Sequence, residues 1–355
     1  MESLDTLFRD YLKDYVMPFD KAVQRAIKAH SDLRKDLEAD EKLGPSIVRT
    51  LLSGSYGRDT AIRAIKDVDI VVQLKLSLAD LQALARENET AQECLLRLLQ
   101  EAILRTGRAA RTRKARRSVQ VTLPKEINEI GEELPELTLD IVPVLIQIDK
   151  DTDPMLIADK DLVGWYDTYP NTQLKDSERR NNASTELNGY RSYKSLVKIM
   201  KAWKVVHFGG AKTPKGFILE CLTATYHNPN AEHWIDAVHD LFRNICLQWP
   251  DPEMLATIPL VHDISNQNPT FIPIAKTVDD AKRVLGKIHK HLTLIEQAIQ
   301  EAETDTYKGA KTLQRVFGSD PETIYFPLPK EEKSNLAAPA VVKSPHDIRE
   351  AKPFG

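Results

Sequence analysis

Three aspartates stand in short apolar stretches that the sequence predicts to be β-strands. Asp67 and Asp69 begin one such stretch, and Asp140 lies in another at residues 137–148. Side chains alternate between the faces of a strand, so Asp67 and Asp69 point the same way. If the strands are neighbours, three carboxylates converge, and each is costly to bury in its ionised form. A hard divalent cation such as Mg²⁺ resolves this, because it takes oxygen ligands and shares its shell with phosphates.

An Asp-x-Asp on its own has an ordinary interpretation, since acids at the start of an exposed edge strand simply face water. The pattern becomes more specific because Gly54-Ser55 lies upstream, at the end of the apolar run 47–52. Glycine allows close backbone approach, and serine adds a hydroxyl to turn amides that can hold a phosphate. Residues 59–65 are then expected to form a helical turn. The combination indicates metal-assisted chemistry on a phosphate.

The elements that position these residues change character along the chain. Helical spacing of apolar residues covers 3–38 and 78–104, and strand patterns occur around 69–72, 118–123 and 137–148. From about residue 184 the pattern is helical, with segments at 193–203, 217–226, 234–247 and 278–302. The last 20 or so residues are rich in Pro, Lys, Ser and Ala, and we expect them to be disordered. The sequence therefore predicts an α+β half followed by a helical half.

The bulk composition excludes several classes of protein. The 355 residues carry a formal net charge of −3, which favours no particular partner. The three cysteines have no ligand-like spacing, which argues against a zinc site or a disulfide framework and for a reducing compartment. We find no signal peptide and no membrane span, so a cytoplasmic location and no membrane partner are expected.

Two basic features could contact phosphates. Lys194, Lys198, Lys201 and Lys204 follow one another by four, three and three residues and so share one helix face, either solvated or phosphate-binding. Residues 105–117 (RTGRAARTRKARR) hold seven basic residues and no acid. No aromatic residue is interleaved there, which weakens single-strand binding. A solvated or substrate-steering role is the preferred interpretation, with nucleic-acid contact as the alternative.

Several stretches together resemble the DNA polymerase β-like nucleotidyltransferases. Within that superfamily the chain is similar to the cGAS/DncV-like enzymes of bacterial anti-phage signalling (CBASS). The stretches that carry the resemblance are GSY at 54–56 with TAI at 60–62, DVDI at 67–70, RSVQV at 117–121, LDIVP at 139–143, the Lys-x-Trp helix at 196–203 and FILE at 217–220. The resemblance implies a bilobal α+β protein with a polymerase β-like core and a mixed sheet at 1–183, a helical domain at 184–318 and a largely disordered tail at 319–355.

The resemblance also implies roles for particular residues. Asp67, Asp69 and Asp140 would be the catalytic acids and hold two Mg²⁺ ions, for which Mn²⁺ can substitute. The donor triphosphate would be bound by Gly54 and Ser55, and from the helical half by Lys201. Lys198 and Phe217 are further candidates for nucleotide binding; many relatives carry a base-stacking tyrosine where Phe217 stands. The zinc-binding insertion of the animal cyclic GMP–AMP synthase is absent, which argues against DNA sensing by that route.

The expected activity is synthesis of a cyclic di- or trinucleotide from ATP and other NTPs, with release of pyrophosphate. An acceptor hydroxyl would attack the donor α-phosphorus in line, and a second reaction would close the ring. Two alternatives stay open: a nucleotidyltransferase acting on an RNA 3′-end or a protein hydroxyl, and a non-catalytic nucleotide sensor. Three mutually repelling carboxylates speak against the sensor.

The chain ends in glycine, Gly355, after a tail without a core-forming pattern. A flexible terminal glycine fits the narrow active site of a ubiquitin-style conjugating enzyme. The resemblance makes this relevant, because some of these synthases are conjugated through their C-termini by E1/E2-like partners. The ordinary alternative is that a tail must end in some residue.

Overall fold

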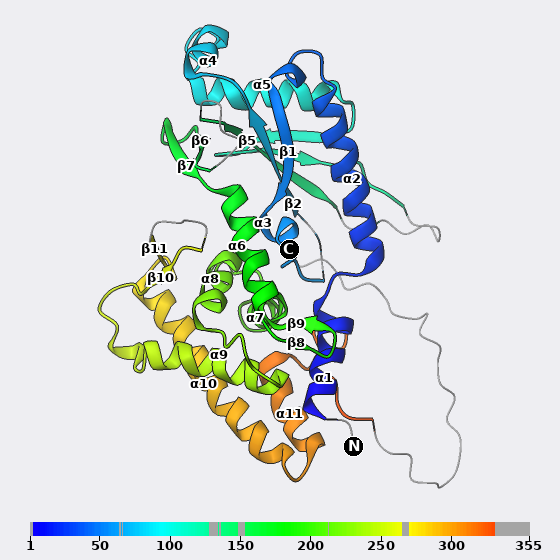
Figure 1. Ribbon diagram of the computed structural model, residues 1–355, viewed down its shortest axis with the longest axis vertical. Helices are drawn as coiled ribbons and strands as arrows, with labels where there is room; N and C mark the ends of the chain where they lie inside the picture. The colour runs from blue at the N-terminus through cyan, green and yellow to red at the C-terminus, as the bar shows by residue number, and fades with distance from the viewer. Residues whose placement is uncertain are drawn as a thin grey trace. The chain divides into compact units, whose positions relative to one another are not determined.

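A computed structural model describes residues 3–63, 65, 67–127, 134, 136–147, 153–211, 213–264 and 270–330 (Figure 1). These residues fall into two compact units. The α+β unit lies within Pro18–Glu178, and the helical unit lies within Met1–Met17, Arg179–Ile264 and Asn268–Gly355. Within the described ranges, no helix is long and apolar enough to cross a bilayer.

The α+β unit is built on one mixed sheet of seven strands. Its main path runs β1-β2-β5-β4-β3, and the hairpin β6-β7 is attached to the end of β5. β2 and β5 are parallel, and the other neighbouring pairs are antiparallel. The strands are β1 (Ile47–Ser53), β2 (Asp67–Leu74), β3 (Arg111–Lys114), β4 (Val119–Thr122), β5 (Thr138–Leu145), β6 (Met155–Asp159) and β7 (Gly164–Thr168). This confirms the predicted α+β class. The two strands that bear the aspartates, β2 and β5, are neighbours, which is the condition under which the three acids converge.

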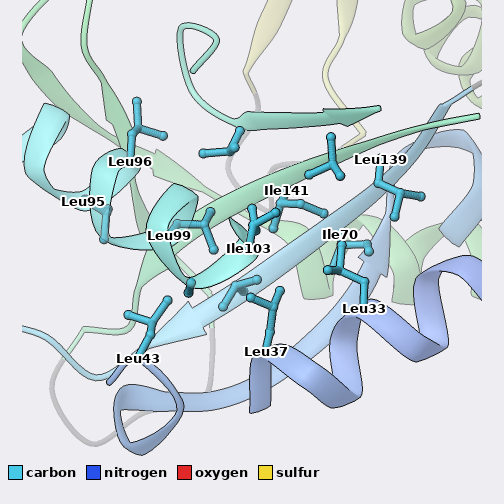
Figure 2. Close-up of a cluster of buried hydrophobic side chains, with 14 of the residues drawn as sticks. Leu33, Leu37, Leu43, Ile70, Leu95, Leu96, Leu99, Ile103, Leu139 and Ile141 are labelled. Carbon is cyan, nitrogen blue, oxygen red and sulfur yellow. The ribbon is translucent and has the colours of Figure 1, made fainter. Parts of the chain in front are cut away.

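One face of this sheet is covered by two long helices, α2 (Asp20–Glu38) and α5 (Ala91–Arg105). Figure 2 shows Leu33 and Leu37 of α2 and Leu99 and Ile103 of α5 meeting strand side chains in one apolar cluster. The strand residues in this cluster alternate with the aspartates along β2 and β5. The acids therefore lie on the opposite face of the sheet from the helices.

Several predicted helices have different limits. The predicted helix at 78–104 is two helices, α4 (Leu78–Leu84) and α5, each begun by a capping box from Ser77 or Thr90. The predicted helical turn at 59–65 is wrong for the described residues of that range. The turn forms earlier, as α3 (Gly54–Gly57), and it ends because Asp59 adopts a positive φ of 55°.

The first predicted helix, at 3–38, is also interrupted. α1 (Leu4–Tyr11) continues into a π-helical turn, η1 (Leu12–Val16), and α2 starts after Met17-Pro18-Phe19. α1 belongs to the helical unit, because Phe8 and Tyr11 pack against Phe317 and Phe326. This differs from the expectation that the N-terminal helix belongs with residues 1–183.

The helical unit confirms the predicted helices of the second half. It contains the end of α6 (Pro170–Ala183), followed by α7 (Ser192–Phe208), α8 (Gly216–Tyr226), α9 (Trp234–Gln248), α10 (Val278–Ala302) and α11 (Thr306–Phe317). Short elements lie between or beside these helices: β8 (Glu186–Leu187), β9 (Tyr190–Arg191), η3 (Pro252–Met254), β10 (Leu260–His262) and β11 (Phe271–Pro273). η2 (Gly44–Ser46) is in the α+β unit. α7 ends at Gly209, whose φ of 51° favours glycine.

Buried Trp203 on α7 is held by a histidine on α10. Its indole Nε1 donates to Nδ1 of His291 over 2.7 Å, and the His207 ring lies 4.2 Å from the His291 ring between centroids. Burial, followed by the charges of His207 and nearby lysines, lowers the pKa of His291 to about 3. A proton on Nδ1 would also oppose the indole N–H, so the folded protein keeps this imidazole neutral.

We therefore expect the free energy of unfolding to fall as the pH drops. The unfolded state binds a proton near pH 6.5 and the folded state does so only near pH 3, so stability is present above 6.5 and is lost between these values. Lowering the pH from about 7 to about 5.5 should cost about 1 kcal/mol through this group. Urea unfolding at the two pH values measures it. His291→Gln keeps an acceptor for Trp203, and an unchanged pH dependence in that variant would contradict the assignment.

Candidate active site

The turn after β1 brings Gly54 directly against Asp69 of the next strand. Ser53 pairs with Asp69 in the β1-β2 register, and the chain then turns through α3. Gly54 has a φ of 59°, and a Cβ built on it would overlap the Asp69 carboxylate. Glycine is required here for both reasons, because the backbone is left-handed and the carboxylate occupies the side-chain position. The position of the Gly54-Ser55 turn and the position of the Asp69 carboxylate therefore depend on each other.

The β2-β5 register aligns the remaining acid with the first two. Asp69 lies opposite Asp140, and Asp67 lies opposite Thr138. Directly opposed residues of neighbouring strands project from the same face, so the three aspartates share the face away from α2 and α5. Thr138 donates a short hydrogen bond from its hydroxyl to the Asp67 carboxylate. That bond holds Asp67 in place at the edge of the group.

The charge of Asp67 acts on the carboxyl group of Asp140. Burial raises the pKa of Asp140 above its ordinary value, and the charge of Asp67 raises it further. Arg113 of β3 acts in the opposite direction and lowers this pKa. A carboxylate whose ionised form is disfavoured by burial and by a like charge is the kind that a bound cation stabilises.

The donor set fits a hard divalent cation such as Mg²⁺. All three candidate ligands are carboxylates, and they lie at adjacent positions of adjacent strands. Their carboxylate oxygens do not surround a single point as the ligands of a complete metal site would. No group of three or more His, Cys, Asp and Glu side chains among the described residues is arranged as a metal site. Mg²⁺ commonly takes only one or two protein carboxylates beside water and substrate phosphate, so an open set of acids still fits it.

Gly54→Ala should separate the turn from the acid. The added methyl group must displace Asp69 or the turn, and alanine is strained at a φ of 59°. We expect a loss of about 1–2 kcal/mol in unfolding free energy and a fall of about 100-fold or more in pyrophosphate release. Chemical denaturation and a pyrophosphate assay measure the two effects. Gly107→Ala is the matched control, since Gly107 also has a positive φ, of 67°, but no atom within 4 Å of the methyl group that alanine would add. Equal losses of activity in both variants would contradict this interpretation.

The other predicted binding residues lie in the helical unit. Lys198 and Lys201 are buried on α7, 5% and 8% exposed, and Phe217 is half-buried at the start of α8. Lys194 and Lys204 are also not exposed, so these four lysines do not form a solvated face. Lys201 Nζ contacts Glu220 Oε1 of α8 at 2.6 Å, and Glu220 is 1% exposed. The FILE motif includes Glu220, but the sequence pattern assigned it no role. A single acid within an otherwise apolar helix is the signal that identifies it.

The basic run 105–117 is mostly neutralised within the fold. Arg105 pairs with Asp40, and Arg108 pairs with Asp32 and Asp36. Arg116 and Arg117 both bind the fully buried Asp159, whose pKa is held far below its ordinary value by these two arginines. Three basic residues of the run remain on β3: Arg111, Arg113 and Lys114. The charge available to a partner is therefore much smaller than the sequence suggests.

Comparison with known proteins identifies the family to which this arrangement belongs. The family described as the Second Messenger Oligonucleotide or Dinucleotide Synthetase domain matches residues 1–181, which contain all three aspartates and the Gly-Ser turn. The chain belongs to this family. As a second messenger synthetase it is a nucleotidyltransferase that uses NTP substrates, and this class of enzyme generally employs divalent metal ions.

A curated relative of this synthetase is the cyclic AMP-AMP-AMP synthase of Acinetobacter sp. (strain ATCC 27244 / 9458). The two are 28% identical over 303 residues, which cover 84% of this chain and 80% of the relative. The similarity extends well beyond the matched family region into the helical unit.

Solved structures share the fold across both units. CdnC from E. coli MS115-1, in complex with HORMA-deltaN, has a TM-score of 0.65 at 17% identity and covers 89% of this chain and 97% of its own. CdnG from Bradyrhizobium diazoefficiens, in complex with GTP, has a TM-score of 0.64 at 14% identity, with coverages of 89% and 95%. Together with the family match and the curated relative, these folds confirm the predicted resemblance to the cGAS/DncV-like nucleotidyltransferases. Vibrio cholerae DncV has a TM-score of 0.53 at 14% identity and covers 89% of this chain and 86% of its own.

Proposed function

We propose that this second messenger synthetase joins NTPs into a cyclic oligonucleotide for anti-phage signalling and that its chemistry takes place at Asp67, Asp69 and Asp140. The observation that carries the proposal is the alignment of Asp69 with Asp140 across β2 and β5, with Gly54 packed against the Asp69 carboxylate. In this arrangement, a turn whose glycine lets a phosphate approach the backbone lies beside acids that could bind a metal ion.

Each residue has a distinct task in this proposal. Gly54 and Ser55 hold the donor triphosphate with turn amides and a hydroxyl, next to the acids. Asp67 and Asp69, which share one face of β2, would hold the metal ion at the donor phosphates. Asp140 would join them in holding the metal ion at the acceptor hydroxyl. Two Mg²⁺ ions held by these acids would lower the pKa of the acceptor hydroxyl and neutralise the leaving pyrophosphate. The hydroxyl oxygen then bonds to the donor α-phosphorus as the bond to pyrophosphate breaks.

The roles proposed for residues of the helical unit come from the family resemblance alone. It assigns Lys201 to the donor triphosphate and makes Lys198 and Phe217 further candidates for nucleotide binding. A lysine suits a triphosphate because its ammonium is a mobile point charge.

The product to look for first is a cyclic trinucleotide of adenylate. The support is the cyclic AMP-AMP-AMP synthase, since the two chains are alignable over most of both lengths. A cyclic dinucleotide is the other expected product.

A phosphatase-resistance assay tests the proposal. Purified protein is incubated with all four labelled NTPs and Mg²⁺ or Mn²⁺, and the mixture is treated with phosphatase. A resistant small product supports the proposal, because a ring has no terminal phosphate to remove, and omission of single NTPs identifies its bases. If label is retained only on added RNA or protein, the proposal is wrong and the protein is a nucleotidyltransferase with a macromolecular acceptor.

No observation favours the alternative functions over this one. The arginines that were candidates for RNA binding are largely bound to Asp32, Asp36, Asp40 and Asp159. Gly355 lies outside the described residues, so conjugation of the C-terminus to an E1/E2-like partner stays a prediction from the resemblance.

A further inference from the structure

Two polar rows cross the sheet on the face that bears the aspartates. In the first, Asp69 lies opposite Asp140, Asp140 lies opposite Gln120 of β4, and Gln120 lies opposite Arg113 of β3. In the second, the opposed residues are Asp67, Thr138, Thr122 and Arg111. Opposed residues share a face, so Arg111 and Arg113 project from the face of the three acids.

Independent contacts confirm which way β3 faces. The hydroxyl of Thr112, between the two arginines, accepts a hydrogen bond from Gln100 of α5 at 2.9 Å, so Thr112 points toward the helices. Arg113 donates from Nη2 to Oε1 of Gln120 at 3.2 Å and lowers the pKa of Asp140. The alternation of β3 thus directs both arginines to the catalytic face and Thr112 away from it.

Arg111 and Arg113 differ from the other arginines of the basic run. Arg105, Arg108, Arg116 and Arg117 each bind an aspartate. Arg111 and Arg113 are exposed, and neither forms an ion pair with an acid in the part of the chain that the structure describes. Charge on an edge strand also discourages pairing with another sheet, but that role does not require the charges to face the acids. Two guanidinium groups beside a phosphate-transfer site suit an anionic group of the substrate.

The order of strands indicates whether the two arginines face the donor or the acceptor nucleotide. The Gly54-Ser55 turn follows β1 at one side of the acids, and β3 is the edge strand at the other side. In an in-line displacement the attacking hydroxyl of the acceptor and the leaving pyrophosphate of the donor lie on opposite sides of the donor α-phosphorus. Strand spacing puts the backbone of Arg113 about 10 Å beyond that of Asp140, within side-chain reach of a nucleotide whose hydroxyl is at Asp140.

We propose that Arg111, Arg113 and Gln120 bind the 5′-triphosphate of the acceptor nucleotide. The acceptor keeps this triphosphate while its ribose hydroxyl attacks the donor. The inference rests on the proposed function and adds to it a binding site for the acceptor, distinct from the Gly54-Ser55 turn. Each guanidinium is expected to contribute about tenfold to acceptor affinity through charge-assisted hydrogen bonds.

Two substrates that each have one role test the proposal. 2′,3′-Dideoxy-ATP can only donate, and α,β-methylene-ATP can only accept, so one phosphodiester forms and pyrophosphate leaves. We expect Arg111→Gln/Arg113→Gln to raise the acceptor KM about 10- to 100-fold and to change the donor KM less than about threefold. Lys114→Gln is the matched control, since Lys114 is on the same strand with its side chain on the α5 side. An increase confined to the donor KM would overturn the proposal.

Comparing α,β-methylene-ATP with adenosine as the acceptor measures how much the triphosphate contributes to acceptor binding. The wild type should prefer the triphosphate acceptor, and the double variant should lose that preference; a preference kept by the variant would overturn the proposal. Calorimetric titration of each acceptor, with Ca²⁺ and saturating dideoxy-ATP, reports the same preference without turnover. If the wild type forms no product, the proposed function fails, and the titration still decides the arginine site. Thermal unfolding identifies a misfolded variant, for which Arg111→Gln alone is the substitute.

Discussion

The Asp67→Asn/Asp69→Asn protein is expected to release pyrophosphate at least about 1,000-fold more slowly than the wild type while keeping its fold. Asparagine has the shape of aspartate but no charge, so it cannot hold a hard cation against water. The amide at residue 69 still fits over Gly54, where the carboxylate is packed. Loss of the Asp67 charge also relieves the repulsion that helps to raise the pKa of Asp140, so the melting temperature should stay the same or rise.

A coupled pyrophosphate assay and a thermal unfolding curve measure these two outcomes. Asp161→Asn is the control, because Asp161 is an exposed aspartate of the same unit that pairs with Lys160 and lies in the turn between β6 and β7, outside the strands that carry the three acids. Turnover of the double variant at the wild-type rate would end the assignment of the catalytic acids. A slow variant that also melts early would attribute the loss to folding instead.

Short-range pattern was enough to predict the strands that carry the acids. The β-branched run at 69–72 and the alternation along 137–148 predicted two strands, and the structure has β2 (Asp67–Leu74) and β5 (Thr138–Leu145) there. The resemblance supplied the expectation that Asp69 and Asp140 act together. Their alignment residue by residue depends on the β2-β5 register, which is set by packing between segments about 70 positions apart in the chain.

Side-chain pairing over long range could not be predicted in the same way. The basic run at 105–117 gave no indication that Asp40 and Asp159 neutralise part of it, since those acids come from elsewhere in the sequence. Its strand character at Arg111–Lys114 was also missed, because charged residues on an edge strand do not give an apolar alternation. The helical turn was predicted too late because the requirement for glycine at residue 54 comes from Asp69 and not from local sequence.

The buried pair Lys201–Glu220 is expected to show the largest effect on stability. Both side chains are nearly inaccessible, and their charged atoms lie 2.6 Å apart. Glu220→Gln or Lys201→Met alone breaks this buried ion pair, at a cost of about 3 kcal/mol or more in unfolding free energy. Glu186→Gln is the control, because Glu186 is an exposed acid of the same unit whose nearest arginine contact is 4.0 Å. Urea denaturation of each variant measures the difference.

The double variant Lys201→Met/Glu220→Leu decides whether Lys201 also has a role in binding. Replacing both members of a buried pair by apolar residues of similar volume is often neutral or stabilising, so we expect most of the lost stability to return. If Lys201 contacts the donor triphosphate, activity does not return with it, and the donor KM stays raised about tenfold or more. If stability and donor KM both return to wild-type values, the pair serves only to join α7 to α8. This cycle separates the two roles because a single substitution of Lys201 changes binding and breaks the buried pair at the same time.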